Sequence, residues 1–325
     1  MPRSSMAFDS AHPTAAERDQ ALLALARVLQ TGGYRHTTVT PATHARVNDR
    51  TGNEWARDLR GVFGWSRPFR AELLPAGLFE LMRRADVVAP HKDGWRSRIR
   101  LSSLDQHLFV HSAYPTSDAD AVFFGPDTYR FVAALRTHLE RDPEPVRRAV
   151  DIGAGSGAGA IALASARPEA EVLAVDINPA ALRLTRINAA VAGTGKVRAA
   201  HSDLLSGVDG RFDLIVANPP YLVDPARRAY RHGGGPLGAG LALAIVDAAI
   251  ERLAPGGRLL LYTGAAIVDG NDPFRAAAEA KLAAAGLTWD YREMDPDVFG
   301  EELDCEAYAT TERIAAVVLT AYLRS

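Results

Sequence analysis

The sequence has almost none of the residues that build disulfide or zinc-cluster proteins. Cys305 is the only cysteine among 325 residues, which excludes an internal disulfide and a zinc site of several cysteines. Long apolar runs are also missing. The longest, residues 237–250, is interrupted by Asp247 and is too short to span a bilayer. No apolar segment follows the N-terminal letters MPRSSMAFDS, so we expect no signal peptide and a cytoplasmic protein without a membrane partner.

The composition has no large excess of either charge. With 47% hydrophobic residues, 23% charged residues and a formal net charge of -2, it is typical of a globular protein. The charge is uneven along the chain. Residues 1–100 hold sixteen Lys and Arg against ten Asp and Glu, whereas the remainder holds 21 against 29. The N-terminal part therefore either faces an anionic partner or carries scattered, solvated arginines.

The N-terminal part mixes helical and strand patterns. Residues 1–13 are small and polar, and we expect them to be flexible. A helix is predicted to follow, because Thr14 and Glu17 have capping-box spacing. A second helix is predicted over residues 75–85, and alternating polarity predicts a hairpin over residues 98–112. These elements indicate a small α+β domain.

A change of pattern near residues 141–148 divides the chain. This segment is charged and holds two prolines, as is typical of a linker or domain edge. We therefore predict an N-terminal substrate-recognition or lid domain over residues 14–140 and a second domain over residues 146–325. In the second domain short apolar strands alternate with helices, which predicts an α/β fold with a mostly parallel sheet covered on both faces.

A glycine-rich turn follows the first predicted strand of the second domain. The letters DIGAGSG place Asp151 shortly before Gly153, Gly155 and Gly157. Glycines at a strand–helix turn permit unusual dihedral angles and let a ligand approach the backbone. Asp151 would repel a pyrophosphate but would favour a cationic ligand.

The next two predicted strands also end in acids. Asp176 follows the glycines by about 20 residues, where an acid can hydrogen-bond ribose hydroxyls. Asp203 is placed to accept a hydrogen bond from an adenine amino group. A single acid at a strand end is often a helix cap. Three successive tips, all on the ligand-binding edge of an open sheet, instead predict a bound ligand.

These tips, with the letters NPPY after a fourth strand, resemble the class I S-adenosylmethionine (SAM) dependent methyltransferases. The combination DIGAGSG, DINP, SDLL and NPPY most resembles the HemK/PrmC-like group, which methylates the side-chain amide of glutamine. It is similar also to the NPPY-type methyltransferases of adenine and guanine amino groups. The resemblance covers roughly residues 149–325. It implies a seven-stranded Rossmann-like sheet with an antiparallel last strand, SAM as cofactor and S-adenosylhomocysteine as product.

In this resemblance the NPPY letters form the catalytic tip. An amide or exocyclic amino nitrogen is a poor nucleophile, because its lone pair is delocalised. The Asn218 side-chain oxygen and the Pro219 carbonyl would accept hydrogen bonds from it, and Pro219 and Pro220 would keep both acceptors rigidly placed. Tyr221 would offer a flat face on which a planar amide or base stacks. Catalytic roles therefore fall to Asn218, Pro219 and Tyr221, and substrate contacts to Pro220 and Tyr221.

The resemblance also assigns contacts outside the NPPY tip. The letters FFGPDTYRFV resemble the family's PRPETE segment, which makes Asp127 and Thr128 its equivalents at the substrate, although Asp127 also suits a helix cap. The implied cofactor contacts are Asp151, Gly153, Gly155, Gly157, Asp176, Ile177, Asp203, Leu204 and Asn218.

The sequence therefore predicts an N-methyltransferase acting on a planar nitrogen, without a metal. The predicted substrate is a macromolecule, either a protein glutamine or a nucleic-acid base, and a small metabolite is the alternative. The basic N-terminal part, with Arg96, Arg98 and Arg100 on one predicted strand, fits a nucleic acid. A non-catalytic SAM-binding protein is a further alternative, whereas an NAD-dependent oxidoreductase would have no use for NPPY. The oligomeric state is not predicted.

Overall fold

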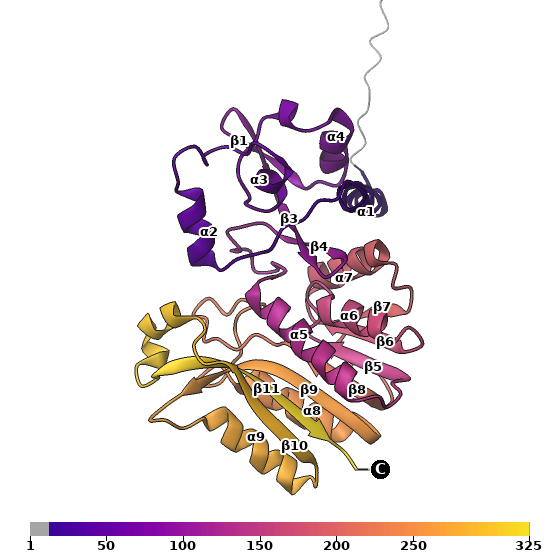
Figure 1. Cartoon of the computed structure of the whole chain (residues 1–325), viewed down its shortest axis with the longest axis vertical. Coiled ribbons are helices and arrows are strands. Elements are labelled where there is room, and N and C mark those ends of the chain that lie inside the picture. The colour runs from indigo at the N-terminus through magenta and orange to yellow at the C-terminus, as the bar shows by residue number, and fades with distance from the viewer. Residues whose placement is uncertain (1–12, 325) are drawn as a thin grey trace, which may run out of the picture.

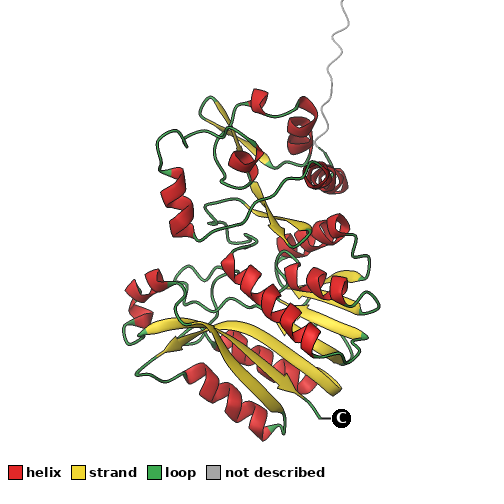
Figure 2. Cartoon of the chain, in the orientation of Figure 1, coloured by secondary structure: helices red, strands yellow, loops and turns green. Residues whose placement is uncertain are grey.

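The computed structural model describes residues 13–324, which form an N-terminal part and a larger sheet-containing part (Figures 1 and 2). The predicted flexible start lies almost wholly outside the described residues. Figure 1 places the short helices and hairpins of the N-terminal part at one end of the long axis and the large sheet at the other. Among the described residues, no helix is both long and apolar enough to cross a membrane.

The N-terminal part is a small α+β unit, as predicted. The capping box at Thr14 and Glu17 is formed and begins the first helix. The predicted second helix and the predicted hairpin are confirmed as α4 and the β3–β4 pair. Its elements are α1 (Ala15–Thr31), α2 (Pro41–Asn48), α3 (Leu59–Phe63), the 3₁₀ turn η1 (Ala71–Leu73), α4 (Ala76–Arg84), β1 (Val88–His91), β2 (Gly94–Ser97), β3 (Ile99–Leu104) and β4 (His107–Ser112).

The prediction that three arginines share one strand is wrong. Arg96 lies in β2, Arg100 lies in β3, and Arg98 lies between the two strands. The break has a local cause, because the Ser97 hydroxyl donates to the Ile99 carbonyl (2.8 Å) and accepts from the Ile99 amide (3.2 Å). This side-chain-to-backbone turn replaces the ladder bonds of a continuous strand. The three side chains therefore do not form a basic stripe.

The larger part contains the predicted seven-stranded sheet, in the order β10-β11-β9-β8-β5-β6-β7. All neighbouring pairs are parallel except those of β11, which is the last strand and is antiparallel to both β9 and β10. The predicted antiparallel last strand is thus confirmed. The strands are β5 (Arg148–Ile152), β6 (Glu171–Asp176), β7 (Val197–His201), β8 (Phe212–Ala217), β9 (Leu253–Ile267), β10 (Thr288–Asp295) and β11 (Arg313–Tyr322).

Helices cover both faces of this sheet. Side chains of α5 and α6 share one core cluster with one face, and side chains of α8 and α9 share a second cluster with the other face. The strands are buried on both faces, which explains why they appear as short apolar runs in the sequence. The remaining elements are α5 (Pro126–Arg141), α6 (Ala158–Ala166), α7 (Pro179–Ala192), α8 (Gly240–Arg252), α9 (Pro273–Ala284) and the 3₁₀ turns η2 (Gly300–Asp304) and η3 (Glu306–Tyr308).

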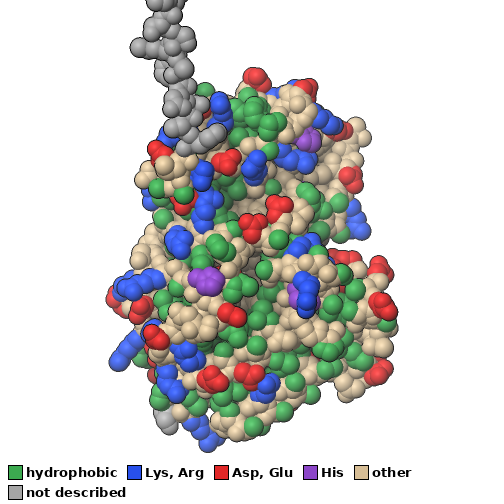
Figure 3. Space-filling model, turned by 180° about the vertical axis from the view of Figure 1, so that it is seen from behind, with side chains coloured by type: hydrophobic (Ala, Val, Ile, Leu, Met, Phe, Trp, Pro, Cys, Tyr) green, Lys and Arg blue, Asp and Glu red, His purple; other side chains and the backbone are tan. Residues whose placement is uncertain are grey.

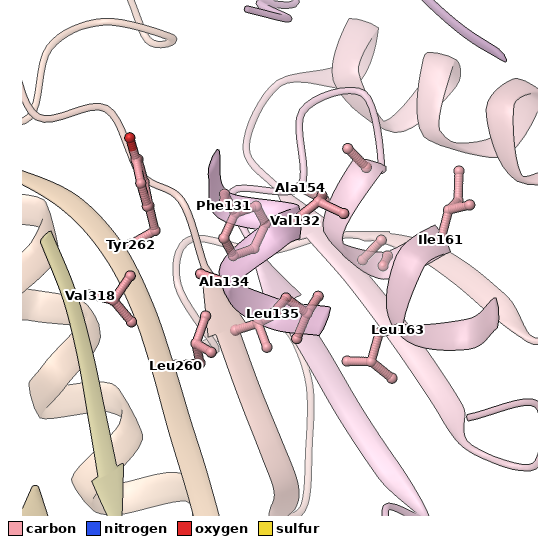
Figure 4. Packing of buried hydrophobic residues seen from close by; sticks show 14 of the residues in the cluster. Phe131, Val132, Ala134, Leu135, Ala154, Ile161, Leu163, Leu260, Tyr262 and Val318 are labelled. Carbon is pink, nitrogen blue, oxygen red and sulfur yellow. The ribbon is translucent and has the colours of Figure 1, made fainter. Parts of the chain in front are cut away.

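Helix α5 packs on the large sheet. Figure 4 shows Phe131 and Leu135 of this helix directed toward Leu260 and Tyr262 of β9. All four side chains are at most 3% exposed. Helix α5 thus shares its core with the sheet, although it precedes the predicted boundary near residues 141–148. The predicted division into two domains remains a prediction. The two parts meet at α7, whose side chains join the core of the N-terminal part.

Candidate functional site

A pocket of about 210 Å³ opens at the edge of the sheet where β5, β6, β7 and β8 end. The ends of parallel strands and the turns after them are the usual ligand site of an open α/β sheet. Fourteen residues are predicted to bind the cofactor or the substrate, and all but Gly157 line this pocket. The thirteen that line it are Asp127, Thr128, Asp151, Gly153, Gly155, Asp176, Ile177, Asp203, Leu204, Asn218, Pro219, Pro220 and Tyr221.

The glycine turn after β5 is built on left-handed residues. Gly153, Gly155 and Gly157 have φ values of 69°, 55° and 81°. A side chain at Gly153 would meet nothing within 4 Å, so this glycine is held by its backbone conformation and leaves the pocket floor bare. Gly157 has another role, because a Cβ there would lie 3.0 Å from the Thr185 side chain. Its predicted cofactor contact is therefore replaced by close packing on α7.

Asp151 lies beneath this turn and is 2% exposed. Its Oδ2 accepts a hydrogen bond from the Ala160 amide (2.8 Å), in the first turn of α6. Burial raises the pKa of Asp151 to about 7, and the nearby Asp176 carboxylate adds to the rise. The carboxyl group is thus poised to ionise near neutral pH, where a cationic ligand would favour its charged form.

Asp176 joins the tip of β6 to the glycine turn. Its Oδ2 accepts from the Gly155 amide (2.9 Å) and its Oδ1 accepts from the Asn178 amide (2.8 Å). Burial raises the pKa of this carboxyl group, while these two hydrogen bonds oppose the rise. Beside it, Ile177 is 51% exposed although it is apolar, and it lines the pocket. An exposed aliphatic side chain next to an acid suits the base and ribose of a nucleoside.

Asp203 and Leu204 continue the pocket wall after β7. Asp203 is exposed and points to no protein partner among the hydrogen bonds of residues 13–324, so its carboxylate is available to a ligand. Leu204 has a left-handed φ of 50°, which is uncommon for a branched residue. This conformation changes the direction of the backbone after β7. Both residues line the pocket, and their contacts with an adenine remain a prediction.

Asn218 and Pro219 follow directly after β8. The Asn218 side chain is partly exposed in the pocket and forms no hydrogen bond with the other described residues. Pro219 is buried, and its carbonyl accepts no hydrogen bond from the part of the chain that the structure describes. Two unused acceptors therefore stand side by side on a loop stiffened by two prolines.

The prediction of an open aromatic face at Tyr221 is wrong. Tyr221 is only 6% exposed, and its hydroxyl donates to Asp127 Oδ2 (2.7 Å). Its ring lies on Gly264 of β9, where an added Cβ would come within 2.1 Å of Cδ2. Phe299 packs against it edge to face at 5.8 Å. The ring borders the pocket but is anchored, so its part is to hold the loop rather than to offer a free stacking surface.

Asp127 is the centre of a buried hydrogen-bond network. Besides Tyr221, it accepts from the Tyr262 hydroxyl (2.7 Å) and from Arg130 Nη1 (3.2 Å), and Arg130 continues to Asp295 (2.8 Å). Asp127 is only 4% exposed, and it is not the helix cap, because Gly125 occupies that position in α5. Burial beside this carboxylate holds the pKa of both tyrosines well above its usual range. The network ties α5, the NPPY loop and β9 together.

Replacing Asp127 by leucine tests how much this network contributes to the stability of the fold. The substitution leaves two buried tyrosine hydroxyls without their acceptor and removes one of the two carboxylate partners of Arg130. We therefore expect a loss of about 2–4 kcal/mol in the free energy of unfolding. Urea denaturation measures it. Tyr262→Phe removes one hydroxyl only, and we expect it to cost about 1 kcal/mol. Equal stability of the Asp127 variant and the native chain would contradict the role of the network.

Several pocket residues were not predicted from the sequence. Phe123, Tyr230, Arg231 and Phe299 line the pocket from loops far apart in the chain. The loop after NPPY is fixed by ion pairs from Arg231 to Asp224 (3.8 Å) and to Glu302. Nothing in the local pattern marks these residues, since their position depends on contacts between distant segments. Within residues 13–324 no three His, Cys, Asp or Glu side chains are placed to hold a metal ion.

The fold and this edge site define a methyltransferase. A family model described as Methyltransferase small domain matches residues 130–267. The pocket fits SAM, because it has bare glycines, an exposed isoleucine beside an acid, and a buried carboxyl group suited to a sulfonium. The match of this family model supports a methyltransferase.

The particular family follows from curated relatives. The release factor glutamine methyltransferase of Deinococcus radiodurans is 38% identical over 68% of this chain and 82% of its own length. The chain therefore belongs to the release factor glutamine methyltransferase family. The enzyme of that name from Cereibacter sphaeroides is 39% identical over 38% of this chain, and the ribosomal protein uL3 glutamine methyltransferase of Neisseria meningitidis serogroup A is 37% identical over 40%. The chain spans about half the length of these two relatives.

Among solved structures, Methanocaldococcus jannaschii Trm5 in complex with adenosine aligns with 80% of this chain and 63% of its own. The two share 16% of their sequence and superpose with a TM-score of 0.49. A likeness of this strength carries no argument about function.

Proposed function

We propose that this protein methylates the side-chain amide nitrogen of a glutamine in a protein substrate of the translation apparatus, and that it acts in the cytoplasm. The observation that carries the proposal is the pair of unused acceptors, on Asn218 and Pro219, at a pocket whose floor suits SAM. A primary amide has two N–H groups, so two adjacent acceptors match it. The names of the relatives, which act on release factors and ribosomal protein uL3, support the same substrate class.

The cofactor would be held by the strand tips. The bare glycine turn would receive the methionine end, Asp176 the ribose hydroxyls, and Ile177 with Asp203 and Leu204 the adenine. Bound SAM supplies a methyl group on a sulfonium centre, which is a good leaving group. Asp151 lies under the turn, where its carboxylate would favour that positive charge.

The chain's own residues would raise the reactivity of the amide. The Asn218 side-chain oxygen and the Pro219 carbonyl accept from the two N–H groups and turn the nitrogen lone pair toward the methyl group. The C–N bond forms as the S–C bond breaks, and the nitrogen loses one proton afterwards. No strong base is needed, because the proton becomes acidic once the nitrogen is alkylated. Tyr221, tied to Asp127, keeps the loop in place during this step.

Asp151 gives SAM binding a predicted pH dependence. Below pH 7 this carboxyl group is largely protonated, and above pH 7 it is ionised. A sulfonium favours the ionised form, so binding releases a proton and the affinity for SAM rises with pH, by about tenfold between pH 6 and pH 8. S-adenosylhomocysteine lacks the sulfonium charge, and its affinity should stay nearly flat. Calorimetry with both ligands tests this, and Asp151→Asn should flatten the SAM curve.

A transfer experiment tests the substrate class. Tritiated SAM is incubated with the purified protein and lysate of a strain lacking the gene, and the label is sorted into protein, RNA, DNA and small molecules. We expect label in protein, as N5-methylglutamine after peptide mapping by mass spectrometry. Label in RNA or DNA would overturn the protein substrate, and label only in small molecules would do the same.

The distribution of charge also favours a protein over a nucleic acid. Of the three arginines predicted to form a basic stripe, Arg100 is buried at 4% exposure and the other two lie on different segments. Figure 3 shows Lys and Arg interspersed with Asp and Glu on both halves of one face. A nucleic-acid binding face usually gathers basic side chains in a continuous patch. The salt dependence of any RNA or DNA binding should accordingly be shallow.

A further inference from the structure

A buried cation in the N-terminal part has no counter-ion among residues 13–324. Arg100 of β3 is 4% exposed, and its Nε donates to the Ser112 carbonyl (3.2 Å). No carboxylate of the described chain lies within 4.0 Å of its guanidinium. The two terminal nitrogens of the guanidinium make no hydrogen bond within residues 13–324. They are not among the fully enclosed atoms, so they are accessible to solvent. A buried charge without a partner is costly, which makes its presence informative.

Tyrosines and histidines are found around Arg100. Tyr114, Tyr129 and Tyr34 interact electrostatically with its guanidinium. Burial, aided by the positive charge of Arg100, lowers the pKa of His36 and His44 to about 4. The same causes lower the pKa of His111, which is fully buried. At neutral pH the three histidines are therefore uncharged, and Arg60 adds a second positive charge near His36.

The three histidines on which Arg100 acts electrostatically also hold unused polar atoms. His36 Nε2, His44 Nε2 and His111 Nδ1 are buried without a hydrogen-bond partner among the described residues. The His44 ring packs against Tyr114 at 4.0 Å, which fixes it beside the cluster. Native proteins rarely leave several buried polar atoms unpaired in one place unless a ligand or water completes them. Arg100 and these three histidines therefore all have unused hydrogen-bonding capacity.

The cluster is next to the methyl-transfer pocket. Ser112, which holds Arg100, pairs with Val122 through two hydrogen bonds, Ser112 N to the Val122 carbonyl (3.1 Å) and Val122 N to Ser112 Oγ (2.8 Å). Val122 lines the pocket. From the other side Tyr129, whose hydroxyl accepts from the Thr38 amide (3.1 Å), directly follows the pocket residue Thr128. Arg100 is therefore linked to the wall of the pocket through Ser112 and Val122.

We propose that Arg100 and the histidines around it form a carboxylate-binding subsite that recognises an acidic side chain of the substrate close to the methylated nitrogen. The free ends of the guanidinium form a planar fork that matches a carboxylate in two parallel hydrogen bonds. A carboxylate would neutralise the charge of Arg100, which has no carboxylate partner among residues 13–324. That the acid belongs to a protein rests on the proposed function, but the subsite itself does not.

The test uses the full chain and acetate as the probe. At fixed ionic strength, replacing chloride by 100 mM acetate should raise the melting temperature of the native protein by about 2–3 °C, as expected for a weak single site. Arg100→Met should lose this rise. It should also melt no lower than the native protein without acetate, since it removes an unpaired buried charge. Arg198→Met, at a side chain that is 73% exposed, is the matched control and should keep the rise.

Three results would overturn the proposal. A variant Arg100→Met that melts well below the native protein, with no acetate effect in either, would make Arg100 a structural residue. Arg100→Lys guards against a folding failure, because it keeps the charge and should keep a smaller acetate effect. A larger rise with phosphate than with acetate would contradict the carboxylate class. A loss of S-adenosylhomocysteine affinity in Arg100→Met would assign the carboxylate to the cofactor instead of the substrate. None of these measurements requires turnover, so they are independent of the proposed reaction.

Discussion

Asn218→Ala is expected to lower kcat by a factor on the order of 10² or more, because it removes an acceptor that acts in the transition state. The loop itself should survive the change. Its shape is fixed by Pro219 and Pro220, and by Tyr221 on Asp127, none of which depends on the Asn218 side chain. The affinity for SAM, measured by calorimetry, should change only modestly. Single-turnover kinetics with saturating SAM and substrate would isolate the loss in the chemical step.

Asp176→Ala is the matched control with the opposite signature. Its carboxylate holds the Gly155 and Asn178 amides, so its loss loosens the glycine turn on the cofactor side. We expect SAM affinity to fall by about tenfold or more, with kcat at saturating SAM largely retained. If both variants lost only SAM binding, the division between a cofactor side and a nitrogen side of the pocket would be wrong.

The sheet and its edge were predictable because their signals are local. Buried parallel strands are short apolar runs, and the turn after each strand is marked by a residue type with a specific backbone or polar role. The Gly153–Gly157 turn, Asp176 and Asp203 could therefore be assigned to one edge before their distances were known. The antiparallel last strand followed from the resemblance and not from the periodicity.

The anchoring of Tyr221 could not be predicted in the same way. Its partner Asp127 is 94 residues away along the chain, and the space beneath its ring exists only because Gly264 has no side chain. Taken alone, each of these residues fits an ordinary structural role. Tyr221 would be an exposed tyrosine, Asp127 a helix cap and Gly264 a glycine within a strand. Only the packing of α5 and β9 brings them together. The burial of Arg100 could not be predicted for a related reason. Alternation of polar residues in the sequence does not distinguish an exposed row of charges from a buried charge.

Gly264→Ala is expected to be the second most damaging change at the site. The added methyl group would come within 2.1 Å of Tyr221 Cδ2 and 2.3 Å of Cε2. The ring must move, because the backbone at Gly264 is held in β9 by its pairing with Ala316 of β11. Movement of the ring breaks the hydrogen bond to Asp127 and shifts the NPPY acceptors. A misplacement of about 1 Å costs on the order of 10² in rate, and overpacking costs about 1–3 kcal/mol of stability.

Gly77→Ala separates these effects from a general glycine effect, because a Cβ at this helical position meets nothing within 4 Å. It should leave kcat unchanged and raise stability slightly, since alanine is the better helix former. Denaturation and single-turnover rates of both variants should be compared with Tyr221→Phe, which keeps the ring in place but loses the Asp127 contact. We expect Tyr221→Phe to lose less activity than Gly264→Ala. If Gly264→Ala retained full activity, the loop would not depend on the seat of the tyrosine ring, and Asn218 and Pro219 would have to be held by the prolines alone.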